Sequence, residues 1–139
     1  MSASLRFSAA MRLSGQRAFA RVFGRRQAAG NGVITVHVCP RPETEPPQGR
    51  IPPVRLGLSV SRRVGPAVRR QRWKRRLREA FRQHQHQILP GWDYVVVVRA
   101  QALPEVDELA SMLQSLGHQA IHRSRGRTGQ PRPRRKESP

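Results

Sequence analysis

The stretch from Arg62 to Arg82 carries the residue types best suited to chemistry, and that chemistry is the binding of anions. Ten of its 21 residues are Lys or Arg, and Glu79 is its only acid. On a helix, cations and one amide would form a ladder along one side, spaced about one turn apart. The ladder consists of Gln71, Lys74, Arg75, Arg78 and Arg82. Like charges at this spacing repel each other, so an anionic partner would remove a cost that the isolated helix carries.

The opposite side of the same helix is apolar and is expected to pack on a core. Its stripe consists of Trp73, Leu77, Ala80, Phe81, His84 and Ile88. The simplest alternative is a solvated basic face, which is what most charge runs are. The density of the charge, its confinement to one side and the near absence of Glu partners favour a binding surface instead.

The composition of the whole chain also indicates a polyanionic partner. The 139 residues suffice for one domain, and 27 Lys and Arg against 8 Asp and Glu give a formal net charge of +19. An anionic membrane is another polyanion, but no segment approaches the roughly 20 apolar residues that span a bilayer. Cys39 is the only cysteine and the N-terminus lacks the apolar run of a signal peptide. We therefore expect a cytoplasmic protein that binds nucleic acid and no membrane.

Catalytic and metal-binding patterns are sparse. The five histidines are His37, His84, His86, His118 and His122. No acid pair or Ser-His-Asp order accompanies them, and no Gly-rich phosphate loop is present. The short spacings within the last four occur in metal sites, but without a cysteine or carboxylate companion we interpret them as surface or half-buried histidines. The sequence predicts neither a catalytic residue nor a metal ligand in the protein itself.

The elements that must position the ladder form an α+β pattern. Ser14 is a candidate N-cap for a first helix that runs to about Phe23, and Gly117 is a candidate C-cap for the last helix, which opens at Pro104. The predicted strands are Val33–Cys39, Leu56–Ser61 and Tyr94–Val98. Breaks are expected at Ala28–Gly32, Pro40–Pro53 and Pro90–Gly91. The order helix, two strands, helix, strand, helix predicts an α+β or split α/β sandwich with one small sheet.

The domain is expected to span residues 13–122. Residues 1–12 are small, polar and weakly basic, and are expected to form a flexible N-terminus. Residues 123–139 contain no large apolar side chain and are expected to be a disordered basic tail.

From Leu56 onward, the sequence LGLSVSRRVGPAVRRQRWKRRLREAFR resembles the bacterial ribonuclease P protein subunit. That family has a strand ending in GLSVS, a turn of two cations with Val-Gly, then Ala-Val and a helix Arg-Asn-Arg-x-Lys-Arg-x-x-Arg-Glu-x-Phe-Arg. The residues that match the helix are Arg70, Arg72, Lys74, Arg75, Arg78, Glu79, Phe81 and Arg82. Gln71 replaces the usual Asn and moves the amide out by one methylene. A weaker resemblance extends from about Leu13 to Gly117.

The resemblance implies a fold as well as a function. The expected fold is a single small α+β domain with one mixed β-sheet packed by helices, like the sandwich of ribosomal protein S5 domain 2. It adds a short strand near Arg50 to Val54, giving the order α-β-β-(β)-α-β-α. It also implies a left-handed crossover through the basic helix, where sequence alone would predict a right-handed one.

Ribonuclease P is a ribonucleoprotein whose RNA, with bound magnesium ions, cuts precursor tRNA to leave the mature 5′ end. The resemblance therefore implies two partners, ribonuclease P RNA and precursor tRNA, with Mg held mainly by the RNA and the substrate, and no obligate protein partner. The RNA-binding residues would be Arg62, Arg63, Arg69, Arg70, Gln71, Arg72, Lys74, Arg75, Arg78 and Arg82. An enzyme that accepts many substrates needs phosphate contacts, because these position the nucleic acid without selecting its sequence.

The resemblance also implies a cleft for the single-stranded 5′ leader. Its residues would be Phe19, Phe23, Thr35 and His37, the last at about the place where the family usually has Tyr. Both phenylalanines also fit an ordinary core. The alternative function is a small basic ribosomal or nucleoid protein without a role in a reaction. An independent nuclease is disfavoured by the missing acids.

Overall fold

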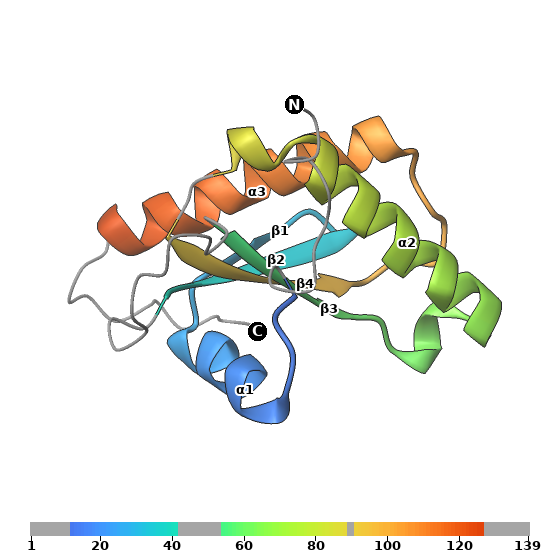
Figure 1. The fold of residues 1–139 in the computed structure, drawn as a ribbon, viewed down its shortest axis with the longest axis horizontal. Helices are drawn as coiled ribbons and strands as arrows, with labels where there is room; N and C mark the ends of the chain where they lie inside the picture. The colour runs from blue at the N-terminus through green and yellow to red at the C-terminus, as the bar shows by residue number, and fades with distance from the viewer. Residues whose placement is uncertain (1–11, 42–53, 89–90, 127–139) are drawn as a thin grey trace, which may run out of the picture.

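One four-stranded sheet separates helix α1 from helices α2 and α3 (Figure 1). The computed structural model describes residues 12–41, 54–88 and 91–126. The helices are α1 (Gln16–Arg25), α2 (Ala67–Gln83) and α3 (Val106–Gly126), with short 3-10 turns η3 (Arg62–Val64) and η4 (Gln85–Gln87) at the two ends of α2. The strands are β1 (Ala28–Gly30), β2 (Ile34–Pro40), β3 (Val54–Ser59) and β4 (Trp92–Val98).

The sheet is mixed, with the strand order β1-β2-β4-β3. The pairs β1–β2 and β2–β4 are antiparallel, whereas β3 and β4 are parallel. A parallel pair needs a crossover connection, and α2 supplies it. The predicted α+β class, the mixed sheet and the crossover through the basic helix are therefore confirmed, while the left hand of that crossover stays a prediction.

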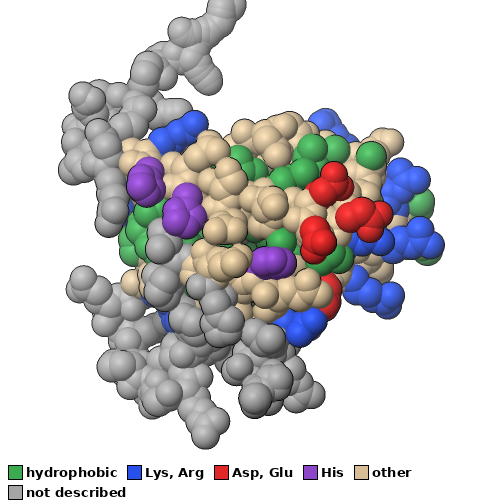
Figure 2. Space-filling view, turned by 90° about the horizontal axis from the view of Figure 1, so that it is seen from above, with side chains coloured by type: hydrophobic (Ala, Val, Ile, Leu, Met, Phe, Trp, Pro, Cys, Tyr) green, Lys and Arg blue, Asp and Glu red, His purple; other side chains and the backbone are tan. Residues whose placement is uncertain are grey.

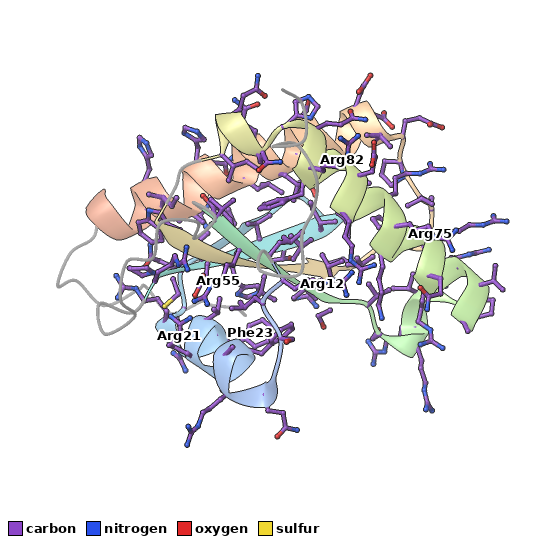
Figure 3. All side chains as sticks on the ribbon, viewed as in Figure 1. Arg12, Arg21, Phe23, Arg55, Arg75 and Arg82 are labelled. Atoms are coloured by element: carbon purple, nitrogen blue, oxygen red, sulfur yellow. The ribbon has the colours of Figure 1, made fainter. Side chains whose placement is uncertain are left out.

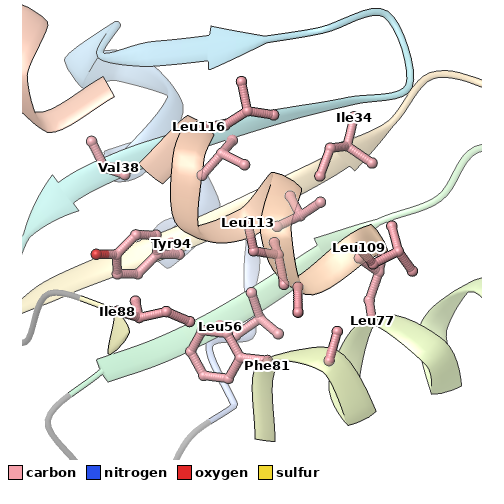
Figure 4. Close-up of a cluster of buried hydrophobic side chains, with 14 of the residues drawn as sticks. Ile34, Val38, Leu56, Leu77, Phe81, Ile88, Tyr94, Leu109, Leu113 and Leu116 are labelled. Atoms are coloured by element: carbon pink, nitrogen blue, oxygen red, sulfur yellow. The ribbon is translucent and has the colours of Figure 1, made fainter. Parts of the chain in front are cut away.

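The main core lies between the sheet and the pair α2 and α3 (Figure 4). Alternation along β2 turns Ile34, Val36 and Val38 toward these helices, and all three side chains are fully buried. The predicted stripe of α2 is confirmed for Trp73, Leu77, Ala80 and Phe81, which are all buried, whereas His84 is the half-buried C-cap of the helix.

The structure corrects the predictions around α1 and the extra strand. The helix begins at Gln16 and its N-cap is Gly15, whose φ of 97° suits glycine, so the predicted cap at Ser14 is wrong. The short additional strand is β1, inside the predicted break that follows α1. Of the segment Arg50–Val54, where an additional strand was expected, only Val54 is described, and it begins β3.

Two helix ends also differ from the predictions. Helix α2 ends at Gln83, so Ile88 reaches the core from the segment after η4 rather than from the helix. Gly117 lies inside α3 and not at its end, so the predicted C-cap is wrong. A glycine suits this position because a Cβ there would come within 3.2 Å of the Tyr94 ring. Helix α3 continues to Gly126, so the first four residues of the predicted 123–139 tail are helical. The remainder of that tail, and the predicted N-terminal segment up to residue 11, lie outside the described residues.

Candidate nucleic-acid interface

Helix α2 presents the predicted ladder on the side opposite its buried stripe. Gln71 and Arg75 are exposed, while Lys74, Arg78 and Arg82 are half-buried. Arg75 projects from α2 away from the sheet (Figure 3). Further exposed cations at the start of α2 and in the preceding turn are Arg62, Arg63, Arg69 and Arg72. We call the following set the cationic surface: Arg62, Arg63, Arg69, Gln71, Arg72, Lys74, Arg75 and Arg78.

Two of the predicted RNA-binding arginines have partners within the protein. Arg82 forms an ion pair with Glu79 at 2.5 Å, and hydrogen bonds from Arg82 and then from Gln83 lower the pKa of Glu79. Arg70 donates from Nε to the carbonyl of Gly65 at 3.2 Å and so braces the turn before α2. These two side chains shape the helix ends, and their charge is less available than that of the cationic surface.

Arg12 extends the cationic surface toward β3, although the sequence analysis did not select it. The neighbouring Leu13 donates its N–H to the carbonyl of Leu56 at 2.9 Å, which fixes this segment beside β3. Burial, and then repulsion from the Arg12 guanidinium, lower the pKa of Arg78. Because 66 positions separate the two arginines, no local pattern could have predicted their proximity.

The surface at the start of α3 is acidic, in contrast to the cationic surface. Figure 2 shows Asp and Glu side chains gathered toward one end of this view, with Lys and Arg side chains beyond them. The acids at the start of α3 are Glu105, Asp107 and Glu108. Anion binding is therefore favoured on the α2 side and disfavoured at the start of α3.

The strand register aligns side chains of neighbouring strands into rows, and three of these rows lie on the side of the sheet that faces α1. The anchor row contains Cys39, Asp93 and Arg55. The aromatic row contains Ala28, His37, Val95 and Gly57. The open row contains Gly30, Thr35, Val97 and Ser59, none of which is buried.

The anchor row holds α1 on the sheet through charge. Arg21 of α1 forms an ion pair with Asp93, whose side chain is fully buried, and also donates to the carbonyl of Pro40 at 3.1 Å. Arg55 of β3 also donates to Asp93, Nε to Oδ1 at 2.8 Å. Arg21 further donates to Cys39 Sγ at 3.1 Å. The position of α1 thus depends on a buried carboxylate between two guanidinium groups.

Phe19 and Phe23 of α1 pack over the aromatic row, and this brings three of the four predicted leader residues together. Phe23 meets the His37 ring edge to face with centroids 4.8 Å apart, and lies 6.1 Å from the Phe19 ring. Phe19 packs on Gly57, where a Cβ would come within 2.8 Å of its ring. Phe19 is half-buried against the small cluster under α1, whereas Phe23 stays 37% exposed. Thr35 lies next to this group, in the open row.

The surroundings of His37 favour its uncharged form. Burial, and then the nearby charge of Arg99, lower its pKa. Its Nδ1 atom is buried and has no hydrogen-bond partner among the described residues. A ring packed on Phe23 therefore stands at the position for which the resemblance implies a Tyr.

The pair His118 and His122 lacks a third ligand among the described residues. His118 and His122 have ring centroids 6.1 Å apart on α3. No three of the His, Cys, Asp and Glu residues in the described ranges lie close enough to hold a metal ion. None of the helices in these ranges is long and apolar enough to cross a membrane.

Comparison with known proteins gives one consistent family. The sequence model of the family "Ribonuclease P" matches residues 7–120. The ribonuclease P protein component of Geobacillus kaustophilus is 37% identical over 115 residues, covering 81% of this chain and 87% of that protein. That of Shouchella clausii is 41% identical over 91 residues, covering 66% and 69%.

Solved structures agree with the sequence comparison. The ribonuclease P protein of Thermotoga maritima superimposes with a TM-score of 0.62 at 26% identity, covering 77% of this chain and 96% of that one. The Staphylococcus aureus protein gives a TM-score of 0.56 at 28% identity, covering 82% and 94%. Fold, sequence and the arrangement of the basic helix therefore agree that this chain belongs to the family of ribonuclease P protein components, the protein subunit of a ribonucleoprotein endoribonuclease.

Proposed function

We propose that this chain binds ribonuclease P RNA through the cationic surface and binds the 5′ leader of precursor tRNA on the sheet side that faces α1. One observation carries the proposal. Arg72, Arg75 and Arg78 make no ion pair or hydrogen bond with any described residue, although they follow one another along a single helix. Because the chain belongs to the ribonuclease P protein family, the expected partner is ribonuclease P RNA, whose phosphates would neutralise these three arginines.

The cationic surface suits RNA because its groups match phosphates. Guanidinium forks donate two parallel hydrogen bonds to a phosphate. The Gln71 amide adds a donor and an acceptor that fit a base edge or a 2′-hydroxyl. A dense set of cations also lowers the repulsion between the catalytic RNA and its substrate, both of which are polyanions.

The aromatic row and the two phenylalanines of α1 that pack over it suit an unpaired strand. Phe23 offers a partly exposed ring, and bases stack on aromatic rings without regard to sequence. His37, as a neutral ring beside Phe23, offers a second flat surface. This arrangement fits a subunit that must accept leaders of many sequences.

Magnesium ions would be held mainly by the RNA and the substrate. Carboxylate oxygens are the ligands that Mg²⁺ prefers in proteins, and in the described ranges no three His, Cys, Asp or Glu residues lie close enough to hold a metal ion. When bound, magnesium supplies the activation of water and the stabilisation of charge at the scissile phosphate. The protein's own residues hold phosphates and bases.

We expect the purified protein alone to leave precursor tRNA uncut, and to raise cleavage by ribonuclease P RNA at low magnesium concentration. The physical reason is that protein cations replace part of the charge neutralisation that magnesium otherwise provides. The measurement is the cleavage rate of a 5′-extended tRNA with RNA alone, with protein alone and with both, across a magnesium titration. Robust cleavage by RNA-free protein, or no stimulation at any magnesium concentration, would contradict the proposal.

Binding of the RNA should weaken steeply with salt, because each neutralised phosphate releases condensed counterions. Arg75→Ala and Arg78→Ala should each reduce the slope of log affinity against log salt by about one unit or less. Arg17→Ala, which removes an exposed cation from α1, is the matched control and should keep the parent slope. Unchanged slopes in both α2 variants would mean that the ladder is only a solvated face.

A further inference from the structure

The outer side of α3 carries a polar stripe that takes no part in the proposed function. The inner side of this helix is apolar and packs on the sheet through buried leucines at positions 109, 113 and 116. The outer stripe follows the same helical period, and its residues, none of them buried, are Ser111, Ser115, His118 and His122. Because α3 and α1 cover opposite sides of the sheet, this stripe is remote from the surface proposed to bind the leader (Figure 1).

The stripe lies on a stretch of α3 without formal charge. The chain has no Asp, Glu, Lys or Arg from Leu109 to His122, although Lys and Arg alone make up 27 of its 139 residues. The next residue, Arg123, donates from its guanidinium to the carbonyl of Ala28 at 2.7 Å and is thereby directed toward β1. A cation bound on the stripe would therefore meet fewer like charges than one bound on α2.

The rings of His118 and His122 lie close together without a competing partner. Their centroids are 6.1 Å apart, and the ring planes are tilted by 31°. Neither ring forms a hydrogen bond or ion pair with a described residue. Since a neutral imidazole keeps one nitrogen with a free lone pair, the two rings together offer two donor atoms to a metal ion.

The spacing of the two histidines suits a single metal ion. Two histidines at i and i+4 on one helix face bind one zinc ion in the zinc-binding helices of metalloproteases. With Zn–N bonds of about 2.0–2.1 Å, two imidazoles on a tetrahedral ion have ring centroids about 5 Å apart. A change of rotamer at the exposed His122 can close the difference from the observed separation.

We propose that His118 and His122 together bind one divalent transition-metal ion, such as zinc, on the outer side of α3. Water completes the coordination, since the described residues supply no third ligand. Imidazole suits zinc, copper and nickel, whereas Mg²⁺ prefers oxygen ligands. The site is thus chemically distinct from the magnesium ions of the cleavage reaction. The competing interpretation is a pair of solvated histidines that bind no metal.

The test is a calorimetric titration of the complete, RNA-free chain with zinc chloride, copper chloride or magnesium chloride. The parent should bind Zn²⁺ and should bind Cu²⁺ more tightly, while Mg²⁺ should give no signal that depends on either histidine. His118→Ala and His122→Ala should each weaken zinc binding by more than about 10-fold, because even the loss of an outer-shell partner of a ligand costs that much. Ser115→Ala, which removes an exposed hydroxyl one turn before His118, is the matched control and should bind zinc as the parent does.

Thermal melts at rising zinc concentration give a second, independent measurement. An ion that binds the folded helix stabilises it by mass action, so the melting temperature of the parent should rise with zinc and that of His122→Ala should not. His122 is exposed, and melts in the presence of a chelator verify that its replacement leaves the fold intact. Equal zinc affinity in the parent and in both histidine variants would overturn the inference, since the ion would then be held elsewhere in the chain. A parent protein that binds no zinc would overturn it as well.

Discussion

Replacing Trp73 with Ala is expected to lower the free energy of unfolding by about 3–5 kcal/mol. Trp73 is fully buried between α2 and the rest of the core, and its Nε1–H donates to the carbonyl of Gln101 at 3.3 Å. The substitution therefore leaves a large cavity and also frees the segment that follows β4. Because small domains are stable by only about 5–15 kcal/mol, much of the variant could be unfolded at ambient temperature.

Gln71→Ala is the matched control, two residues away on the other side of α2. Gln71 is exposed and makes no hydrogen bond with a described residue, so its loss should change the unfolding free energy by no more than about 0.5 kcal/mol. RNA binding should instead weaken by roughly 0.5–1.5 kcal/mol, as expected for one uncharged hydrogen bond. Denaturant titrations and RNA titrations on both variants measure the two effects. The reverse result, an unfolded Gln71 variant and a stable Trp73 variant, would refute the assigned orientation of α2.

The orientation of α2 could be predicted because it depends on a local pattern. Apolar residues recur at the helical period from Trp73 to Phe81, and cations occupy the remaining positions. The same holds for β2, where alternation and β-branching indicated a strand with Ile34, Val36 and Val38 on one side. In both cases the spacing of apolar residues along the sequence indicates which side chains are buried.

Elements without such a pattern were missed. Strand β1 is only Ala-Ala-Gly, and it exists because the backbone of β2 offers it a partner. Gly117 has the residue type of a helix cap, yet the close approach of the Tyr94 ring explains it. The hydrogen bond from Arg99 to Thr35 depends on the register between β2 and β4. Pairings of this kind join distant positions, so no window of sequence shows them.

The family resemblance indicated which RNA is the partner, and the charge pattern alone could not. A basic helix indicates an anionic partner, but no property of its charge distinguishes ribonuclease P RNA from another nucleic acid. The two departures from the family pattern are Gln71 and His37. The structure gives both a consistent environment, since Gln71 is exposed among cations and His37 is a neutral ring against Phe23.

The buried carboxylate under α1 gives the second large expected effect. Asp93 is fully buried, and Arg21 and Arg55 approach it from α1 and β3. The sequence run after Trp92 predicted a strand buried on both sides, but it did not reveal that a charge at its start would be compensated by arginines 72 and 38 positions away. Burial of a charge is tolerated here only because both partners are in place.

Asp93→Asn should therefore destabilise the protein by about 3–5 kcal/mol, because the neutral amide leaves two guanidinium groups facing each other in a partly buried site. Glu79→Gln is the matched control, since it breaks an ion pair with Arg82 that solvent screens, and its unfolding transition should change far less. In the triple variant Arg21→Met, Arg55→Met and Asp93→Leu, apolar groups replace the whole cluster, and most of the lost stability should return. Urea titrations of the RNA-free proteins measure all three. An Asp93→Asn protein as stable as Glu79→Gln would show that the anchor row does not hold α1 in place. A triple variant less stable than Asp93→Asn would show instead that the arginines stabilise α1 through their other acceptors, Cys39 and Pro40.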